Sequence, residues 1–198
     1  MTSNALPPAK GDIDGCRRCP LWERATQGVA GSGPRTARIL LVGEQPGDEE
    51  DRQGEPFVGP AGRLLRRAIQ GAGLEAGDVF LTNAVKHFSW IARGARRIHK
   101  TPTQREVAAC LDWLDAEIAA LRPRVIVALG ATAIGALLGR RVSVRDARDA
   151  GHPHASGAQV VATFHPSAVL RAPDDVRRRE LYRLLVEDLT RAKGLLEP

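Results

Sequence analysis

The stretch ILLVGEQPGD at residues 39–48, together with the pattern at residues 61–72, decides the fold of this sequence. Residues 39–42 form a continuous apolar run, which is typical of a short strand buried on both faces. A loop rich in glycine and proline follows, and apolar residues then recur at helical spacing over residues 61–72. This part of the chain therefore predicts a strand, a loop and a helix in succession.

The same order of strand and helix recurs further along the chain. The other predicted pairs are residues 79–82 with 103–121, residues 125–129 with 131–138, and residues 160–163 with 174–192. Parallel strands need long crossover connections, which helices usually supply. The sequence therefore predicts an α/β fold in a single domain, with a four-stranded parallel sheet and helices on both of its faces.

Length and composition agree with one globular domain. The 198 residues are 43% hydrophobic and 26% charged, which is too apolar for disorder over the whole length. Residues 1–12 are rich in proline, alanine and glycine, so we expect a flexible tail there and the domain over residues 13–198. No apolar run approaches the roughly 18 to 20 residues of a membrane span, and residues 1–15 lack the pattern of a signal peptide. We therefore expect a cytoplasmic protein that does not bind membranes.

The charge balance indicates a polyanionic partner. Lysine and arginine together number 29 against 23 aspartates and glutamates, which gives a net charge of +6 and a pI near 9.9. Net charge alone gives no specificity, but it makes nucleic acid the leading candidate. We expect the chain to act as a monomer.

Polar side chains follow three of the predicted strands. Glu44 comes after the first strand, Asn83 after the second and His165 after the fourth, whereas the third is followed only by GAT at residues 130–132. In such sheets the ligand binds outside the carboxyl ends of the strands. Taken singly, these residues have ordinary interpretations as a solvated acid, a turn cap and a hydrogen-bonded histidine. Their joint placement favours a functional site.

Cysteine spacing predicts a metal or cluster site. Cys16 and Cys19 are separated by two residues, and the third cysteine, Cys110, lies far away in the sequence. Three cysteines are too few for a paired disulfide framework, whereas the C-x2-C spacing suits one metal ion or cluster. Redox chemistry and coincidence are the alternatives, and the spacing favours ligation.

Four motifs in combination resemble those of the uracil-DNA glycosylase superfamily. They are GEQPGDEED at residues 43–51, PFVGPAG at 56–62, TNAVK at 82–86 and HPSAVLR at 165–171. Their order and spacing also match, and the likeness covers most of residues 16–185. The resemblance implies a uracil-DNA glycosylase-like α/β/α fold and uracil-containing DNA, single- or double-stranded, as the partner.

Within this superfamily the sequence is most similar to the iron–sulfur branch, close to family four, and there to the UdgX type. Gln45, His87 and the basic insertion at residues 93–100, with RRIH at residues 96–99, carry this likeness. Two departures are Ala95, where the type usually has lysine, and SAVLR in place of the commoner SSLLR in the last motif. Neither departure removes a reactive group.

The resemblance implies that Cys16, Cys19, His87 and Cys110 hold a 4Fe–4S cluster, with His87 where family four usually has cysteine. The same donors would satisfy tetrahedral zinc, and the sequence does not separate the two. The cluster would be structural, because its ligands come from the amino-terminal segment, a loop after the second strand and a helix.

The implied substrate pocket must accept a uracil extruded from the DNA. The Asn83 amide offers a donor and an acceptor that match uracil O4 and N3–H but oppose the cytosine amino group. Phe57 offers a face on which the base stacks, with plain core packing as the alternative. Further candidates for substrate contact are Gln45, Asp48, Asp51 and Arg171, the two aspartates in supporting roles.

Cleavage of the glycosidic bond places negative charge on the leaving uracil and positive charge on the sugar. The resemblance implies that His165 donates to uracil O2 and that Glu44 stabilises the sugar cation and orients a nucleophile. Leu170 would enter the minor groove as an apolar wedge beside Arg171, which would bind a phosphate.

His99 decides between two mechanisms. In the UdgX type the equivalent histidine bonds to C1′ of the sugar, so that uracil is excised once and the protein stays attached to the abasic DNA. The alternative is a conventional glycosylase that uses water, in which a loop of Arg93, Arg96, Arg97, His99 and Lys100 only binds phosphate. In either case we expect Arg96, Arg97 and Lys100 to bind the DNA. A non-catalytic module that binds DNA damage is the alternative from another class.

Overall fold

Four parallel strands form the centre of the sheet in the computed structural model, which describes residues 6–197. They are β1 (Ile39–Gly43), β2 (Val79–Asn83), β5 (Val125–Leu129) and β7 (Gln159–Thr163). The strand order is β2-β1-β5-β7, and each adjacent pair is parallel. These strands are the apolar runs that the sequence predicted, and they begin or end within one residue of the predicted bounds.

A fifth strand, β6 (His152–Pro153), lies antiparallel to β7 at the edge of the sheet. The predicted four-stranded, fully parallel sheet is therefore wrong in its strand count and at this edge. The strand contains two residues and no apolar run, so no hydrophobic pattern marks it in the sequence. Proline is tolerated here because the outer side of an edge strand needs no donor.

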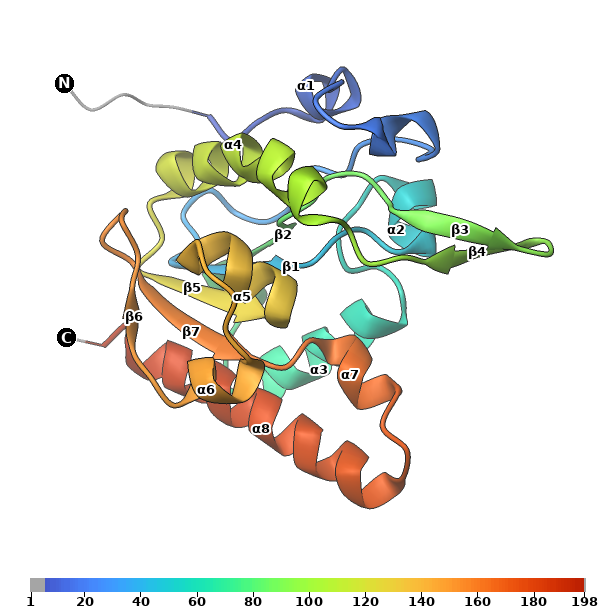
Figure 1. The fold of residues 1–198 in the computed structure, drawn as a ribbon. Coiled ribbons are helices and arrows are strands. Elements are labelled where there is room, and N and C mark those ends of the chain that lie inside the picture. The colour runs from blue at the N-terminus through green and yellow to red at the C-terminus, as the bar shows by residue number, and fades with distance from the viewer. Residues whose placement is uncertain (1–5, 198) are drawn as a thin grey trace, which may run out of the picture.

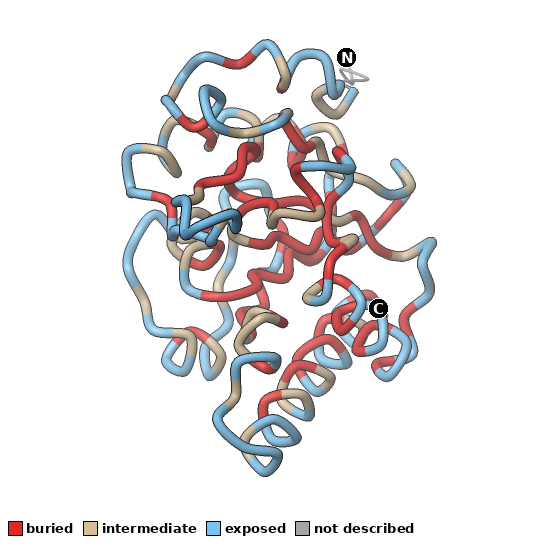
Figure 2. The backbone as a smooth tube through the Cα atoms, turned by 90° about the vertical axis from the view of Figure 1, so that its right-hand side faces the viewer, coloured by how far each residue is buried: buried red, intermediate tan, exposed pale blue. Residues whose placement is uncertain are grey.

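Helices cover both faces of the sheet (Figure 1). One face packs against α3 (Pro60–Gly71) and α8 (Asp175–Gly194), and the other against α4 (Gln104–Leu121) and α5 (Ala131–Leu138). Alternate side chains of β1 enter the two hydrophobic cores, which explains the unbroken apolar run. Figure 2 shows the buried segments running through the middle of the fold. Among the described residues, no helix is long and apolar enough to cross a membrane.

Several short helices surround this framework. They are α1 (Lys10–Asp14), the 3-10 helices η1 (Pro20–Glu23) and η2 (Ala76–Asp78), α2 (Asp48–Gln53), α6 (Val144–Arg148) and α7 (Pro166–Leu170). The helix α1 begins inside the predicted tail of residues 1–12, because Ile13 is fully buried and holds this segment on the body. Residues 1–5 of that tail lie outside the described residues.

The basic insertion forms a β-hairpin instead of the loop that the sequence suggested. Its strands are β3 (Trp90–Arg93) and β4 (Arg96–His99), which pair antiparallel and project from the body (Figure 1). Gly94 takes a φ of 59° in the turn, a conformation that glycine adopts without steric cost. His99 thus lies at the end of a strand whose position is fixed by the rest of the hairpin.

Candidate active site

A cleft of about 810 Å³ opens at the carboxyl ends of the parallel strands. It brings together Glu44, Asn83 and His165, which follow or end β1, β2 and β7 as predicted. The predicted site residues among its lining are Glu44, Gln45, Asp48, Phe57, Asn83, His99, His165, Leu170 and Arg171. Asp51, Arg96, Arg97 and Lys100 are not part of this lining.

Both carboxylate oxygens of Glu44 are held. His99 Nε2 lies 3.1 Å from Oε1, and the hydroxyl of Thr132 donates a hydrogen bond to Oε2. Burial raises the pKa of Glu44, but the hydrogen bonds from His99 and Thr132 outweigh this effect and leave the pKa below its ordinary value. The site therefore presents a fixed anion beside an imidazole.

Thr132 is a site residue that sequence reasoning missed. It lies in the first turn of α5, directly after β5, within the tripeptide at residues 130–132. The only signal was its position after the third strand, since a lone threonine carries no specific chemistry.

His165 is held as a neutral donor. The backbone N–H of Ser167 donates to Nδ1 at 3.1 Å, which leaves the ring proton on Nε2. The pKa of His165 is lowered to about 4, chiefly by burial; the charge of Glu44 opposes this effect, and those of Arg171 and His99 add to it. At neutral pH the imidazole is therefore uncharged and able to donate from Nε2.

Phe57 forms one wall of the cleft in a strained conformation. Its φ of 58° is left-handed, which costs a bulky residue about 1–3 kcal/mol. Arg66 donates to the Phe57 carbonyl at 2.6 Å, and the ring stacks on His165 with centroids 6.3 Å apart. Phe57 also belongs to the hydrophobic core, so the core-packing alternative holds, and the same residue lines the cleft.

Close packing joins Phe57 to the buried amide of Asn83. A Cβ added to Gly43 would lie 2.4 Å from Asn83 Oδ1 and 2.6 Å from the Phe57 ring. Only glycine at the end of β1 leaves room for both side chains. The amide and the ring therefore both lie close to Gly43 in the lining of the cleft.

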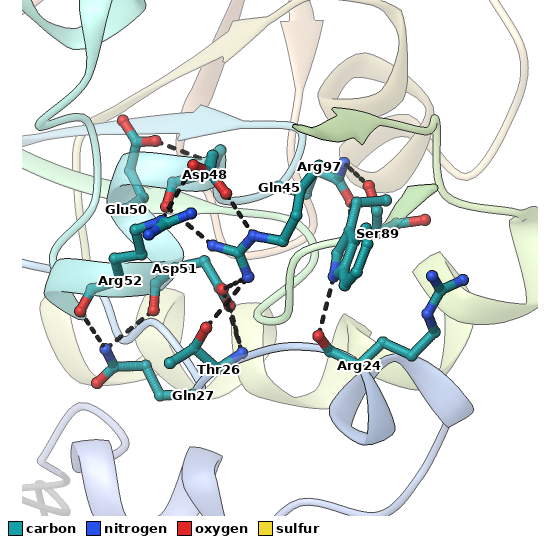
Figure 3. Close-up of polar contacts among 12 residues, drawn as sticks. Arg24, Thr26, Gln27, Gln45, Asp48, Glu50, Asp51, Arg52, Ser89 and Arg97 are labelled. Atoms are coloured by element: carbon teal, nitrogen blue, oxygen red, sulfur yellow. Dashed lines mark hydrogen bonds and ion pairs between the residues drawn. The ribbon is translucent and has the colours of Figure 1, made fainter. Parts of the chain in front are cut away.

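Arg97 attaches the hairpin to α2 (Figure 3). Its guanidinium lies 2.5 Å from Asp48 Oδ1 and 2.6 Å from Asp51 Oδ2, and Asp51 is fully buried. Asp51 also accepts a hydrogen bond from the Thr26 backbone N–H. The sequence suggested DNA contact for Arg97 and substrate contact for the aspartates, but the ion pairs occupy these charges within the protein.

Gln45 holds the base of the same hairpin (Figure 3). Its amide nitrogen donates to the carbonyls of Ser89 and Lys100, each at 3.1 Å, and its oxygen accepts from the Ser89 N–H at 2.9 Å. These contacts use the amide that was predicted to bind substrate. Because Lys100 directly follows His99, they also fix the backbone next to His99.

The remaining predicted DNA-binding residues are exposed at the surface. Leu170 is 41% exposed at the rim of the cleft, beside Arg171. Arg96 and Lys100 are exposed, and neither makes an ion pair among residues 6–197. This placement leaves their cationic groups available to a phosphate.

Of the predicted cluster ligands, Cys19 and Cys110 lie side by side, and the described residues form no metal site. The thiols of Cys19 and Cys110 share a hydrogen bond, which lowers the pKa of Cys19 to about 6. Trp113 Nε1 donates to Cys16 Sγ at 3.3 Å, and burial lowers the pKa of His87, which favours its neutral form. The donor types suit a cluster, but in the described part of the chain no three histidine, cysteine or acidic side chains are arranged to hold a metal ion.

A parallel sheet whose carboxyl edge gathers an acid, an amide and a neutral imidazole in a cleft defines an α/β protein with an enzyme-like site. The family model described as "Uracil DNA glycosylase superfamily" matches residues 30–190, and the chain belongs to this superfamily.

Similar proteins bear related names. The chain is 41% identical over 183 residues to a type-4 uracil-DNA glycosylase of Thermotoga maritima, covering 92% of this chain and 90% of that protein. It is 40% identical over 168 residues to a type-4 uracil-DNA glycosylase of Pyrobaculum aerophilum, covering 81% and 82%. It is 35% identical over 187 residues to a type-5 uracil-DNA glycosylase of Thermus thermophilus, covering 85% and 80%.

Proposed function

We propose that this protein excises uracil from DNA by cleaving the N-glycosidic bond. The convergence of Glu44, Asn83 and His165 in one cleft carries this proposal. The names of the similar proteins support it. The cleft volume of about 810 Å³ falls within the range of sites that enclose a small ligand.

The cleft offers the groups needed to select and release uracil. The Asn83 amide would pair with O4 and N3–H of the base, while the Phe57 ring would cover one face of it. The Nε2–H of His165 would donate to O2 as negative charge moves onto the departing base. The anionic Glu44 would stabilise the positive charge that develops on the sugar.

We further propose that His99 then captures the sugar, as in the UdgX type. Uracil leaves with the electron pair of the glycosidic bond, and a nitrogen lone pair of His99 forms a new bond to C1′. The proton that the ring loses passes to Glu44, whose Oε1 lies 3.1 Å from Nε2. An imidazole bonded to a sugar leaves poorly, so each molecule would react once.

A labelled oligonucleotide with one uracil tests the excision and the capture together. After incubation and denaturing electrophoresis, we expect a heat-stable band of low mobility whose amount equals that of the active protein. Abasic product in large excess over protein, without this band, would favour the conventional enzyme that uses water. Absence of excision would contradict both and favour a non-catalytic module; the same oligonucleotide with thymine is the control.

We also propose that Cys16, Cys19, His87 and Cys110 hold a 4Fe–4S cluster that ties the amino-terminal segment to α4. The nearby thiols and the neutral imidazole provide suitable donors, and the cluster takes no part in the chemistry above. Protein purified anaerobically should be brown and contain about four iron atoms per chain. Replacing Cys110 with serine should lower this content, and one zinc without iron in the native protein would refute the cluster.

A further inference from the structure

We infer that the outer face of the β3–β4 hairpin binds the single-stranded DNA that flanks the extruded uracil. This inference rests on the proposed function. The face consists of Ile91, Arg93, Arg96 and Ile98, in which Ile91 lies opposite Ile98 and Arg93 opposite Arg96. Residues directly opposite each other in an antiparallel pair share one face of the sheet.

The two faces of the hairpin differ in their contacts. On the inner face, Arg97 binds the carboxylates of α2, His99 contacts Glu44, and Trp90 Nε1 donates to the Arg24 carbonyl at 2.9 Å. On the outer face, Ile91 is 48% exposed and Ile98 is 37% exposed. The inner contacts thus hold the outer face in a fixed orientation toward solvent.

The residues of the outer face lower the stability of the free hairpin, and a bound anion would offset this cost. Like charges directly opposite each other destabilise a strand pair, and neither Arg93 nor Arg96 forms an ion pair among the residues that the structure describes. The two isoleucines beside them leave apolar surface in water. A ligand with negative charge and an apolar surface would relieve both costs.

Single-stranded DNA has this combination, whereas a duplex presents its phosphates and hides the faces of its bases. Proteins that bind single strands combine a cationic groove with side chains, usually aromatic, on which bases stack; here Ile91 and Ile98 would supply the apolar contact. The outer face is also continuous with the cleft, because Ile98 belongs to the cleft lining. A strand whose uracil enters the cleft would therefore pass over this face, with phosphates at the arginines and a base against the isoleucines.

The inference can be tested without any excision. Fluorescence anisotropy measures the binding of a uracil-free oligothymidine at several salt concentrations. The Ile91→Ser/Ile98→Ser variant should bind the single strand on the order of five-fold more weakly, with an unchanged salt slope. The Arg93→Gln/Arg96→Gln variant should also bind more weakly, and its salt slope should fall by up to about 1.4, since each single-strand phosphate contributes about 0.7.

Matched variants and a duplex make the outcome decisive. The Ile91→Val/Ile98→Val variant keeps the apolar face and should bind like the native protein, as should Arg38→Gln, which alters an exposed arginine at the amino end of β1. Unchanged single-strand binding by the serine variant, with native melting behaviour, would overturn the inference. If the serine variant lost the same affinity for a duplex of the same length, the inference would also be overturned, because the face would then not distinguish single strands from a duplex. Binding of oligothymidine through this face by a protein that leaves uracil in place would contradict only the proposed function.

Discussion

His99→Ser should abolish the covalent adduct while excision of uracil continues. The substitution removes the imidazole that lies 3.1 Å from Glu44 and opens that side of C1′ to water. Excision should slow, because Glu44 loses a hydrogen bond that lowers its pKa, but each protein molecule should now process more than one substrate. Denaturing electrophoresis with excess uracil-containing DNA measures both results.

A matched histidine variant and a mass measurement complete this test. His154→Ser removes a histidine that contacts Ser156 and is not part of the cleft lining, so the adduct should form normally. Mass spectrometry of the digested native complex should place the DNA on His99. Attachment to another residue, or an adduct that persists in His99→Ser, would refute the proposed capture.

Glu44→Gln should lower the rates of both excision and adduct formation on the order of 10²-fold or more, a loss typical of removing one electrostatic contact to a transition state. The amide keeps the shape of the side chain but removes the negative charge that would stabilise the sugar cation. Single-turnover rates with the uracil oligonucleotide measure the effect. Glu49→Gln is the matched control, since Glu49 lines the same cleft but pairs with Arg63 at 3.3 Å. Equal rates for Glu44→Gln and the native protein would remove Glu44 from the mechanism.

The pH profile of the rate reports on the same carboxylate. Because the pKa of Glu44 is lowered in the folded protein, the active anion persists above that pKa and is lost as the pH falls through it. Thr132→Val removes one of the hydrogen bonds that lower this pKa, so the acidic limb of the profile should move to higher pH. Thr132→Ser keeps the hydroxyl and should restore the native profile.

The central framework was predictable from the sequence because strands buried on both faces appear as continuous apolar runs. Strands such as β1 and β5 are apolar at every position, and each precedes a helix that packs on the sheet. Ligands bind at the carboxyl edge of such sheets, so the meeting of Glu44, Asn83 and His165 followed from the order of elements. The short strand β6 shows no such apolar run, because it consists of only two residues, His152 and Pro153.

The partners of individual charges were not predictable in the same way. An arginine such as Arg97 suits a phosphate and a carboxylate equally well, and only the fold shows that Asp48 and Asp51 lie against it. The sequence likewise does not show the partner of the Gln45 amide, because only the folded hairpin brings Ser89 beside it. Sequence reasoning therefore placed these side chains near one edge of the sheet but gave no indication of their partners within the protein.

The attachment of the hairpin has a consequence for folding. An isolated two-stranded hairpin is marginally stable in water, and Arg97 finds its carboxylates 49 and 46 residues earlier in the chain. His99 therefore meets Glu44 only in chains in which these long-range contacts have formed, and contacts between distant residues cost more loop-closure entropy than local ones. A nascent or partly unfolded chain holds the imidazole and the carboxylate apart, so the reactive pair exists only in molecules that have completed their fold.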